Sequence, residues 1–322
     1  MSTLEKKPNI TSQKVRLIFM GTPEFALPGF SALIDASEIE IVGVFTQTDK
    51  PVGRKQIISP PPVKEMALKH GLRVFQPKKI NLETETIRAL KPDLIVVIAY
   101  GKIIPPAILD IPTYGCVNVH ASLLPKYRGA ACLNAPILNG DSETGVTIMR
   151  METGLDTGPI LRQAKIKLNG RESLKDVHDN LSALGAEILV PTLKDLLAGK
   201  IIPQAQDDSR ASYIKTLSKE NGRIDWNQSA SAIERMVRAY NPWPGTSAVC
   251  QDRTIKIIAV ENEILKVNGQ PTGQIFRDGK RLAVQCGQDS LVILKLQIEG
   301  KKAMTAEEFL NGNPGLVGKI LE

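Results

Sequence analysis

Three polar residues of the kinds that catalyse acyl-type transfer stand close together in an apolar setting. Residues 117–128 read VNVHASLLPKYR, and METGLDTG follows at 151–158. An amide, Asn118, precedes an imidazole, His120, by two positions, so a strand would point both side chains to one face. A carboxylate, Asp156, lies downstream in a glycine-flanked loop. Such an amide stabilises a developing oxyanion, the imidazole handles charge and the carboxylate orients the imidazole.

Each of these residues also has a common structural role. His120 could be a structural histidine near a strand end, Asn118 a turn residue, and Asp156 a helix or turn cap. Their shared placement favours chemistry, because open α/β sheets bind ligands at the carboxyl ends of parallel strands. Cys116 precedes the pair on the same strand. A nucleophilic thiol is one reading, and a small packed thiol is the favoured one.

Apolar runs alternate with helical patterns over the first 200 residues. We expect strands at 16–20, 39–45, 72–75, 94–98, 117–120 and 145–151, and helices at 23–34, 62–70, 82–90, 130–138 and 173–197. This alternation predicts an α/β fold with a doubly wound, mostly parallel, Rossmann-like sheet. The turn GTPEF at Gly21 lacks the GxGxxG pattern, which disfavours a nucleotide cofactor.

The pattern changes after Gly199. Residues 200–217 are polar and aperiodic, and we expect a linker. After a short helix within 224–240, five apolar runs at close spacing predict strands at 247–250, 255–260, 273–276, 282–286 and 291–296, as in a small β-barrel. The expected organisation is a flexible N-terminus at 1–14, a catalytic domain at 15–199, a linker at 200–217 and a second domain at 218–322.

The composition is that of an ordinary globular protein. The chain has 322 residues, of which 42% are hydrophobic and 23% charged, enough for two sizeable cores. No stretch is long and apolar enough for a membrane span, so no membrane association is expected, and the polar first residues do not form a signal peptide. Four scattered cysteines form no CxxC pair, so zinc or dithiol chemistry is unsupported and a cytoplasmic location is expected.

The charge is modest but unevenly placed. Lysines and arginines exceed acids by seven, 41 against 34, which alone only hints at a polyanionic partner. Between residues 46 and 64, Asp49 is the sole acid, whereas Lys50, Arg54, Lys55 and Lys64 are basic. Gly53 and the run of prolines at 60–62 interrupt this stretch, which predicts a long, basic, functional loop, with a merely solvated surface loop as the equal alternative.

The central motifs resemble those of the 10-formyltetrahydrofolate-dependent formyltransferases. The resemblance is carried by NVHASLLPKYRGAA from Asn118 and TGVTIMRMETGLDTG from Thr144, and it extends from FMGTPEFA at Phe19 to GKKAM at Gly300. IDWNQSA at Ile224, RAYNPWPG at 238–245 and the basic segment narrow it to members whose acceptor is initiator methionyl-tRNA. The resemblance implies a catalytic Rossmann-like domain followed by an OB-like β-barrel domain that contacts tRNA.

The resemblance also implies specific roles. Asn118, His120 and Asp156 fall on the family's catalytic residues. Ser122, Leu123, Leu124 and Pro125 fall on its folate-contacting segment. The implied co-substrate is 10-formyltetrahydrofolate, with no metal, and the implied acceptor-arm contacts are Lys50, Arg54 and Lys55. A monomer is expected.

Three other functions remain open on the sequence. The chain could formylate an amino-sugar nucleotide or a purine precursor, or it could be a hydrolase that releases formate. Both would use the same amide, imidazole and carboxylate, but neither needs the basic loop and a separate β domain. From a different class, it could be a non-catalytic RNA-binding protein, against which the intact polar trio argues.

Overall fold

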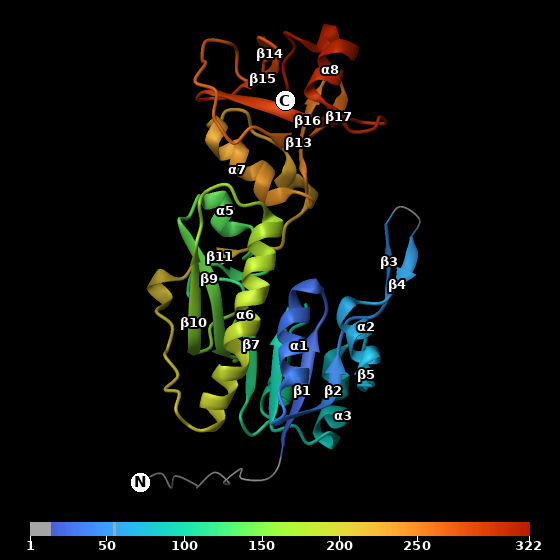
Figure 1. Ribbon diagram of the computed structural model, residues 1–322, viewed down its shortest axis with the longest axis vertical. Coiled ribbons are helices and arrows are strands. Elements are labelled where there is room, and N and C mark those ends of the chain that lie inside the picture. Colours follow the sequence, from blue (N-terminus) through green and yellow to red (C-terminus); the bar gives the residue numbers. More distant parts are fainter. Residues whose placement is uncertain (1–13, 54–55) are drawn as a thin grey trace. The chain divides into compact units, whose positions relative to one another are not determined.

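The chain forms two compact units, each described by itself. The computed structural model describes residues 14–53 and 56–322 (Figure 1). The first unit comprises the described residues up to Arg128 together with Gly145–Lys165 and Asp179–Ser212, and the second comprises Gly129–Thr144, Ile166–His178 and Tyr213–Glu322. The flexibility expected for residues 1–14 falls almost wholly on residues 1–13, which lie outside the described part.

A seven-stranded sheet organises the first unit. Its strands are β1 (Val15–Gly21), β2 (Ile39–Phe45), β5 (Val74–Phe75), β6 (Leu94–Ile98), β7 (Cys116–His120), β9 (Glu143–Arg150) and β10 (Ile160–Lys167). They lie in the order β10-β9-β7-β6-β1-β2-β5. Pairing is parallel from β5 through β7, whereas β9 runs antiparallel to β7. The sheet therefore changes direction beside the strand that carries Asn118 and His120.

Helices α1 (Leu27–Asp35) and α6 (Leu174–Leu197) lie across one face of this sheet (Figure 1). Phe19 of β1 stacks on Phe30 of α1 with ring centroids 4.3 Å apart. Helix α6 lies close to β7, because a Cβ added at Gly185 would be only 3.0 Å from the Val119 side chain. Val119 therefore faces α6, and the alternation of a strand turns Asn118 and His120 to the opposite face.

The opposite face holds a separate apolar cluster. Ile18, Met20, Ile95, Val97 and Cys116 of the sheet pack there with residues of α3 (Thr84–Ala89) and α4 (Pro106–Leu109). Helix α2 (Pro62–Lys69) begins at a proline, as its sequence predicts. Strands β3 (Lys50–Val52) and β4 (Ile57–Ser59) form an antiparallel ribbon within the basic segment.

The second unit is built on an antiparallel sheet. Its strands are β12 (Thr246–Cys250), β13 (Arg253–Val260), β14 (Ile275–Asp278), β15 (Arg281–Gln285), β16 (Ser290–Ile298) and β17 (Met304–Thr305). They lie in the order β12-β13-β16-β15-β14, with β17 paired to β16. Inward-facing side chains of these strands form one core with Trp226, Ile233 and Phe309.

Three helices accompany this sheet within the second unit. Helix α7 (Ala230–Tyr240) begins at Ser229, whose hydroxyl accepts from the Ala232 amide, and α8 (Ala306–Gly312) begins with a capping box of Thr305 and Glu308. Helix α5 (Ala135–Asn139) is tied to α7, because the Asn134 side chain donates to the Ala239 carbonyl at 2.7 Å. The remaining short strands are β8 (Arg128–Gly129) and β11 (Tyr213–Ile214), of which Figure 1 labels β11.

The predicted fold class is confirmed, with local differences. A mostly parallel α/β sheet and an antiparallel β unit are both present. The helix expected at 130–138 is shorter, since α5 begins only at Ala135, before Pro136. Strand β10 was not predicted, because only Leu161 of its eight residues is buried. Among the described residues, no helix is both long and apolar enough to cross a bilayer.

Candidate active site

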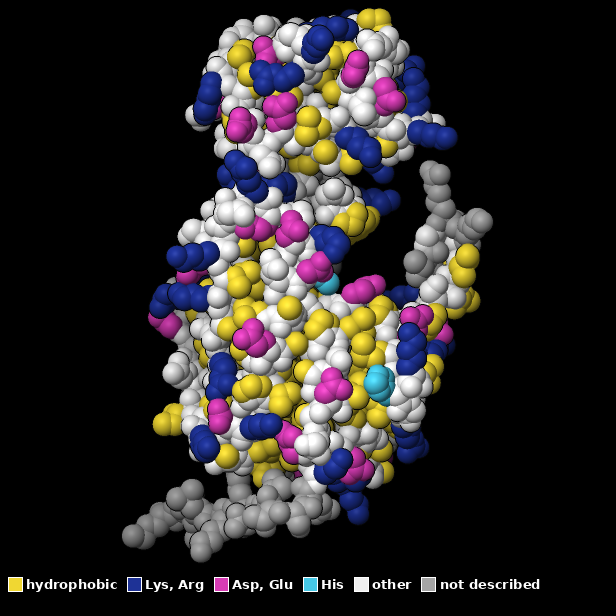
Figure 2. All heavy atoms as spheres, viewed as in Figure 1, with side chains coloured by type: hydrophobic (Ala, Val, Ile, Leu, Met, Phe, Trp, Pro, Cys, Tyr) yellow, Lys and Arg dark blue, Asp and Glu magenta, His cyan; other side chains and the backbone are white. Residues whose placement is uncertain are grey.

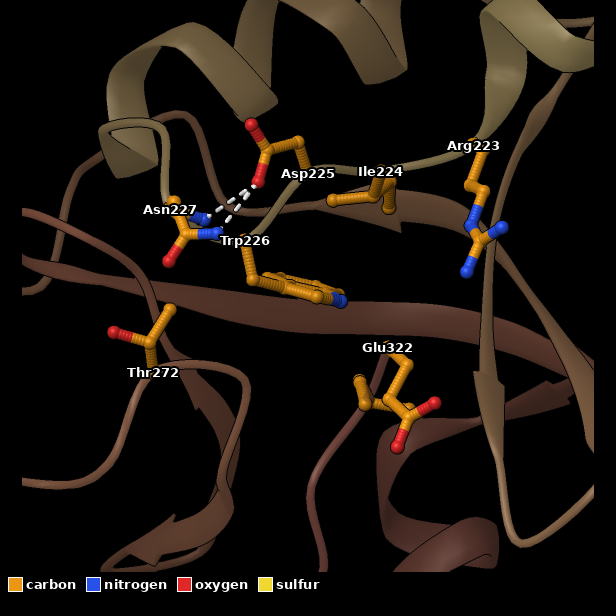
Figure 3. A pocket seen from close by; sticks show the side chains of 8 residues that line it. Arg223, Ile224, Asp225, Trp226, Asn227, Thr272 and Glu322 are labelled. Atoms are coloured by element: carbon orange, nitrogen blue, oxygen red, sulfur yellow. Dashed lines mark hydrogen bonds between the residues drawn. The ribbon is translucent and has the colours of Figure 1, made fainter.

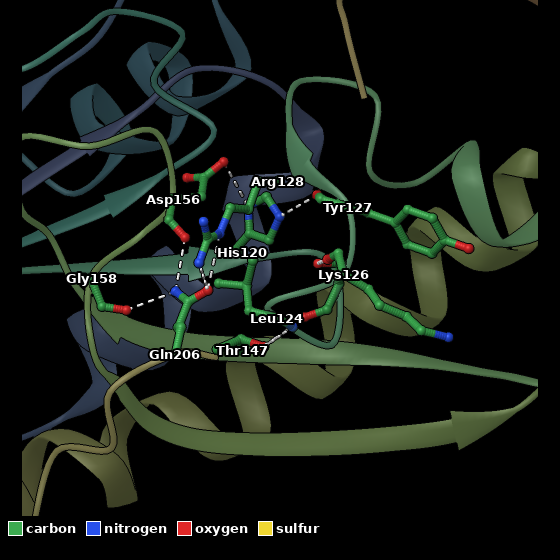
Figure 4. A network of polar contacts seen from close by, with 10 residues as sticks. His120, Leu124, Lys126, Tyr127, Arg128, Thr147, Asp156, Gly158 and Gln206 are labelled. Carbon is green, nitrogen blue, oxygen red and sulfur yellow. Dashed lines mark hydrogen bonds and ion pairs between the residues drawn. The ribbon is translucent and has the colours of Figure 1, made fainter. Parts of the chain in front are cut away.

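His120 and Asp156 meet at the edge of the first unit's sheet. The imidazole Nδ1 lies 3.7 Å from the Asp156 Oδ2, and Nε2 lies 3.0 Å from the Tyr127 carbonyl oxygen (Figure 4). The two side chains are 7% and 15% exposed, so their interaction is shielded from water. The ring is therefore held between two oxygen groups, the Tyr127 carbonyl and the Asp156 carboxylate.

The loop that carries Asp156 is held in an unusual conformation. Asp156 has a φ of 53°, the left-handed region that Asp tolerates better than most residues. At Gly158 a Cβ would lie 1.8 Å from the Arg150 carbonyl oxygen, so only glycine fits. The loop between β9 and β10 therefore approaches its own strand closely and presents Asp156 to His120.

The side chain of Gln206 joins this loop to the residues beside His120. Its Nε2 donates to the Asp156 carbonyl at 2.8 Å and to the Gly158 carbonyl at 2.7 Å. Its Oε1 accepts from Arg128 Nε at 3.1 Å and from an Arg128 terminal nitrogen at 2.8 Å. Arg128 is 1% exposed and also donates to Asp208 at 2.7 Å. Figure 4 shows this network around the imidazole.

Residues 204–212, expected as part of a linker, lie along the loop after β7. The Ser212 hydroxyl accepts from the Tyr127 amide at 2.9 Å, and the Ser212 carbonyl accepts from the Arg128 amide at 2.8 Å. Gln204 pairs through its backbone with Ile160 of β10. Neither Gln206 nor Arg128 was singled out from the sequence, because a polar residue in an aperiodic stretch carries no periodic signal.

Asn118 occupies β7 two residues before His120. Its side chain is half-buried, and it makes no hydrogen bond to any other described residue. Its amide is therefore available to a ligand on the same face of the strand as His120. The structure places all three predicted catalytic residues in the first unit and brings His120 and Asp156 into direct contact.

The segment Ser122–Pro125 is fixed mainly through its backbone. Thr147 Oγ1 donates to the Ser122 carbonyl at 2.7 Å and accepts from the Leu124 amide at 3.0 Å. Gln163 donates to both Thr147 Oγ1 and the Leu124 carbonyl. Ser122 is fully buried and donates to the Lys126 carbonyl. Ser122 and Leu124 therefore set the shape of the turn, whereas Leu123 and Pro125 keep partial exposure.

A cavity of about 460 Å³ lies in the first unit at the start of the Asp156 loop. Leu109, Tyr114, Cys116, Arg150 and Met151 are among its lining residues. This volume is within the range of small-molecule sites. Burial raises the pKa of the Cys116 thiol to about 12, and the residue is 1% exposed, so Cys116 is a packed thiol rather than a nucleophile.

A second cavity, of about 430 Å³, lies in the second unit (Figure 3). Arg223 and Glu322 line it together with Trp226, whose indole N–H is buried with no partner among the described residues. Asp225 is engaged by the Asn227 amide and side chain at 3.1 and 3.0 Å. No histidine lines this cavity, so an acid–base set like that of the first unit is not found there.

The three basic residues predicted to contact an acceptor arm are only partly described. Lys50 Nζ donates to Gln47 Oε1 at 2.6 Å, and Gln47 Nε2 donates to the Tyr100 carbonyl at 3.0 Å. Asp49 binds Lys64 and Gln76, and hydrogen bonds from Gln76 and Lys64 lower its carboxyl pKa. Arg54 and Lys55 lie outside the described residues. Within residues 14–53 and 56–322, no cluster of His, Cys, Asp or Glu is arranged to hold a metal ion.

An amide, an imidazole and a carboxylate in this α/β fold form a set suited to acyl-type transfer, and comparison with known proteins gives the family of the chain. The formyl transferase model matches residues 13–193, and the formyl transferase C-terminal domain model matches residues 216–314. The chain belongs to the formyl transferase family.

Particular relatives can be named. The chain is 50% identical, over 95% of its length and 96% of the relative, to the methionyl-tRNA formyltransferase of Trichlorobacter lovleyi. It is 49% identical to that of Citrifermentans bemidjiense over 95% of this chain and 97% of that one. An N-formyltransferase from Helicobacter canadensis, solved with folinic acid and dTDP-3-aminofucose, shares the fold, with a TM-score of 0.64 and 18% identity over 87% of this chain and 98% of that one.

The close approach at Gly158 gives a first prediction. Gly158→Ala should lower the free energy of unfolding by about 1–3 kcal/mol, because the methyl group must displace the loop or the Arg150 carbonyl. Gly312→Ala, where no atom lies within 4 Å of the added carbon, is the matched control. Chemical denaturation followed by circular dichroism measures both, and equal stability of the two variants would contradict the packing described here.

Proposed function

We propose that this protein transfers the formyl group of 10-formyltetrahydrofolate to the amino group of methionine on initiator methionyl-tRNA, for translation initiation. The observation that carries the acceptor is the identity of about half of all residues, over nearly the whole chain, to relatives named for methionyl-tRNA. The solved sugar formyltransferase supports the fold alone. Formyl-tetrahydrofolate is the co-substrate of this family.

The catalytic trio fits this reaction. The methionyl amine attacks the formyl carbon, and negative charge develops on the formyl oxygen. The Asn118 amide supplies N–H donors for that oxygen, and the His120 Nε2–H joins them by turning from the Tyr127 carbonyl to the oxyanion, in a site largely closed to water. Asp156 lies beside Nδ1 and orients the imidazole. The C–N10 bond then breaks, N10 takes up a proton, and the amine gives up a proton through a water or one of the same groups.

The separation of 3.7 Å between His120 Nδ1 and Asp156 Oδ2 exceeds hydrogen-bond length. Catalytic hydrogen bonds in unliganded enzymes are often long and shorten only with substrate bound. We propose that filling the site shortens this contact and turns the imidazole toward the oxyanion. The loop after β9 would then close on the reacting groups.

The folate is proposed to bind beside Ser122–Pro125. The hydrogen bonds of Thr147 and Gln163 fix this turn, so Leu123 and Pro125 can offer a preformed apolar surface. None of these contacts requires a metal.

The tRNA is proposed to contact both units. In the first unit, Lys50, Arg54 and Lys55 are the proposed contacts of the acceptor arm. In the second unit, lysines, arginines and acids are interspersed on the face shown in Figure 2, so phosphate contacts on that face would come from individual side chains. We propose domain limits of 15–199 and 218–322, a monomer, and a cytoplasmic location, where charged tRNA is found.

The acceptor decides between this function and its alternatives. Radiolabelled 10-formyltetrahydrofolate would be incubated with charged initiator methionyl-tRNA, uncharged tRNA, an amino-sugar nucleotide and buffer alone. Formyl transfer to the charged tRNA only is the expected result. Equal formate release in every arm would favour a hydrolase, and transfer to the sugar would overturn the proposed acceptor.

The polar trio should act as one unit. Asn118→Ala, His120→Ala and Asp156→Ala should each lower kcat by on the order of 100-fold, the usual cost of losing an oxyanion donor or its support. Combining them should cost less than the product of the single effects. Steady-state kinetics with charged tRNA measure this, and near wild-type kcat in His120→Ala would remove the imidazole from the mechanism.

The basic segment should act on tRNA and not on folate. Arg54→Ala should raise KM for charged tRNA while leaving the Kd for folate unchanged, and Arg54→Lys should recover only part of the loss, because it lacks the planar fork. The defect should grow weaker at high salt as phosphate contacts are screened. Lys69→Ala, at an exposed lysine of α2, is the control. An unchanged KM for Arg54→Ala would make the segment a solvated surface loop.

A further inference from the structure

We infer that Gln206 is a positioning residue for formyl transfer, which holds Asp156 against His120 through a closed path made of hydrogen bonds, one peptide link and the contact between the Asp156 carboxylate and the imidazole. The path runs from His120 Nε2 to the Tyr127 carbonyl, along the chain to the Arg128 guanidinium, through Gln206 to the Asp156 carbonyl, and from the Asp156 carboxylate back to His120 Nδ1. Every link in it lies in the first unit.

The amide of Gln206 is suited to this task in a way that few side chains are. It must accept from a cation on one side and donate to two carbonyl groups on the other. A carboxylate could accept from Arg128 but could not donate to Asp156 and Gly158, and a lysine could do only the reverse. The amide therefore links a buried guanidinium to two carbonyl oxygens. As acceptors, these two oxygens cannot pair with each other.

The linkage compensates for the backbone of the Asp156 loop. A residue with φ near 53° is stable only where its surroundings hold it there. The two hydrogen bonds from Gln206 fall on Asp156 itself and on Gly158, on both sides of Thr157. Arg128, 1% exposed, cannot shift without losing Gln206 and Asp208 together. The segment proposed as a linker thus supplies the support that orients the carboxylate.

A single substitution separates positioning from simple support of Arg128. Gln206→Glu keeps an oxygen partner for Arg128 but removes both donations to the loop, whereas Gln206→Met removes both functions. Both variants should lower kcat by on the order of 10- to 100-fold, the cost of misplacing a catalytic group by about 1 Å. KM for folate and for tRNA should stay within about twofold, since Gln206 does not contact either substrate in this proposal.

The control is the same exchange two residues earlier. Gln204→Glu adds the same charge to an exposed side chain, and its kcat should match that of the wild type. Melting temperatures of all variants identify any general loss of folding. Gln206→Glu is the variant on which the inference depends, because it keeps the buried guanidinium paired.

Hydrogen exchange gives a readout independent of activity. In Gln206→Glu and Gln206→Met, the amides of residues 152–158 should exchange faster than in the wild type and in Gln204→Glu. The inference rests on the proposed function for its kinetic arm only: a wild type without formyl transfer would refute that function, while the exchange data would still test the loop. Wild-type kcat, or wild-type exchange, in Gln206→Glu would overturn the inference.

Discussion

Two carbonyl oxygens of one loop converge on a single amide nitrogen, and the candidate active site depends on that convergence. The carbonyls of Asp156 and Gly158 accept from the side-chain nitrogen of Gln206. The side-chain oxygen of Gln206 accepts from the buried guanidinium of Arg128. Buried polar groups are costly unless they are paired. Each member of this set therefore restricts the others, and the left-handed conformation of Asp156 persists because its carbonyl has a fixed partner.

The sheet supplies the other half of the geometry. Parallel strands bring the carboxyl ends of β6 and β7 to one edge. The loop after β9 leaves the sheet beside the amino end of β7 and returns to His120 through Asp156. Helix α6 covers the valine face of β7, which leaves the face of Asn118 and His120 for ligands. Thr147, on β9, fixes the turn after β7 through both the Ser122 carbonyl and the Leu124 amide. The polar side chains of β7, the carboxylate of Asp156 and the hydroxyl of Thr147 that fixes the turn thus come from segments that are distant in sequence.

Sequence patterns predicted the parts of this arrangement that repeat. Apolar runs located β1, β2, β6 and β7, and close spacing located the five long strands of the second unit. The alternation in β7 grouped Asn118 with His120, and the glycine-flanked loop singled out Asp156. The antiparallel direction of β9 was not predicted, because apolar periodicity is the same in either direction.

No periodic pattern in the sequence identified the residues that support Asp156. Gln206 lies in a polar stretch without a period, and its importance arises only once the chain folds back along residues 125–128. Arg128 was quoted only as part of a motif. Its structural role could not be predicted, because that role depends on complete burial. Lys50 is joined to Gln47 and hence to the loop after β6, a contact that its charge alone did not indicate.

In the mechanism proposed here, Gln206 acts on the reaction through Asp156 and through nothing else. A double-mutant cycle on kcat tests this, with Asp156→Asn, Gln206→Glu and the combined variant. If two residues serve one function, the second substitution lowers kcat no further once the first has removed that function. We predict that the combined variant has essentially the same kcat as Asp156→Asn alone. Fully multiplicative losses would show that the two residues act independently and would contradict it.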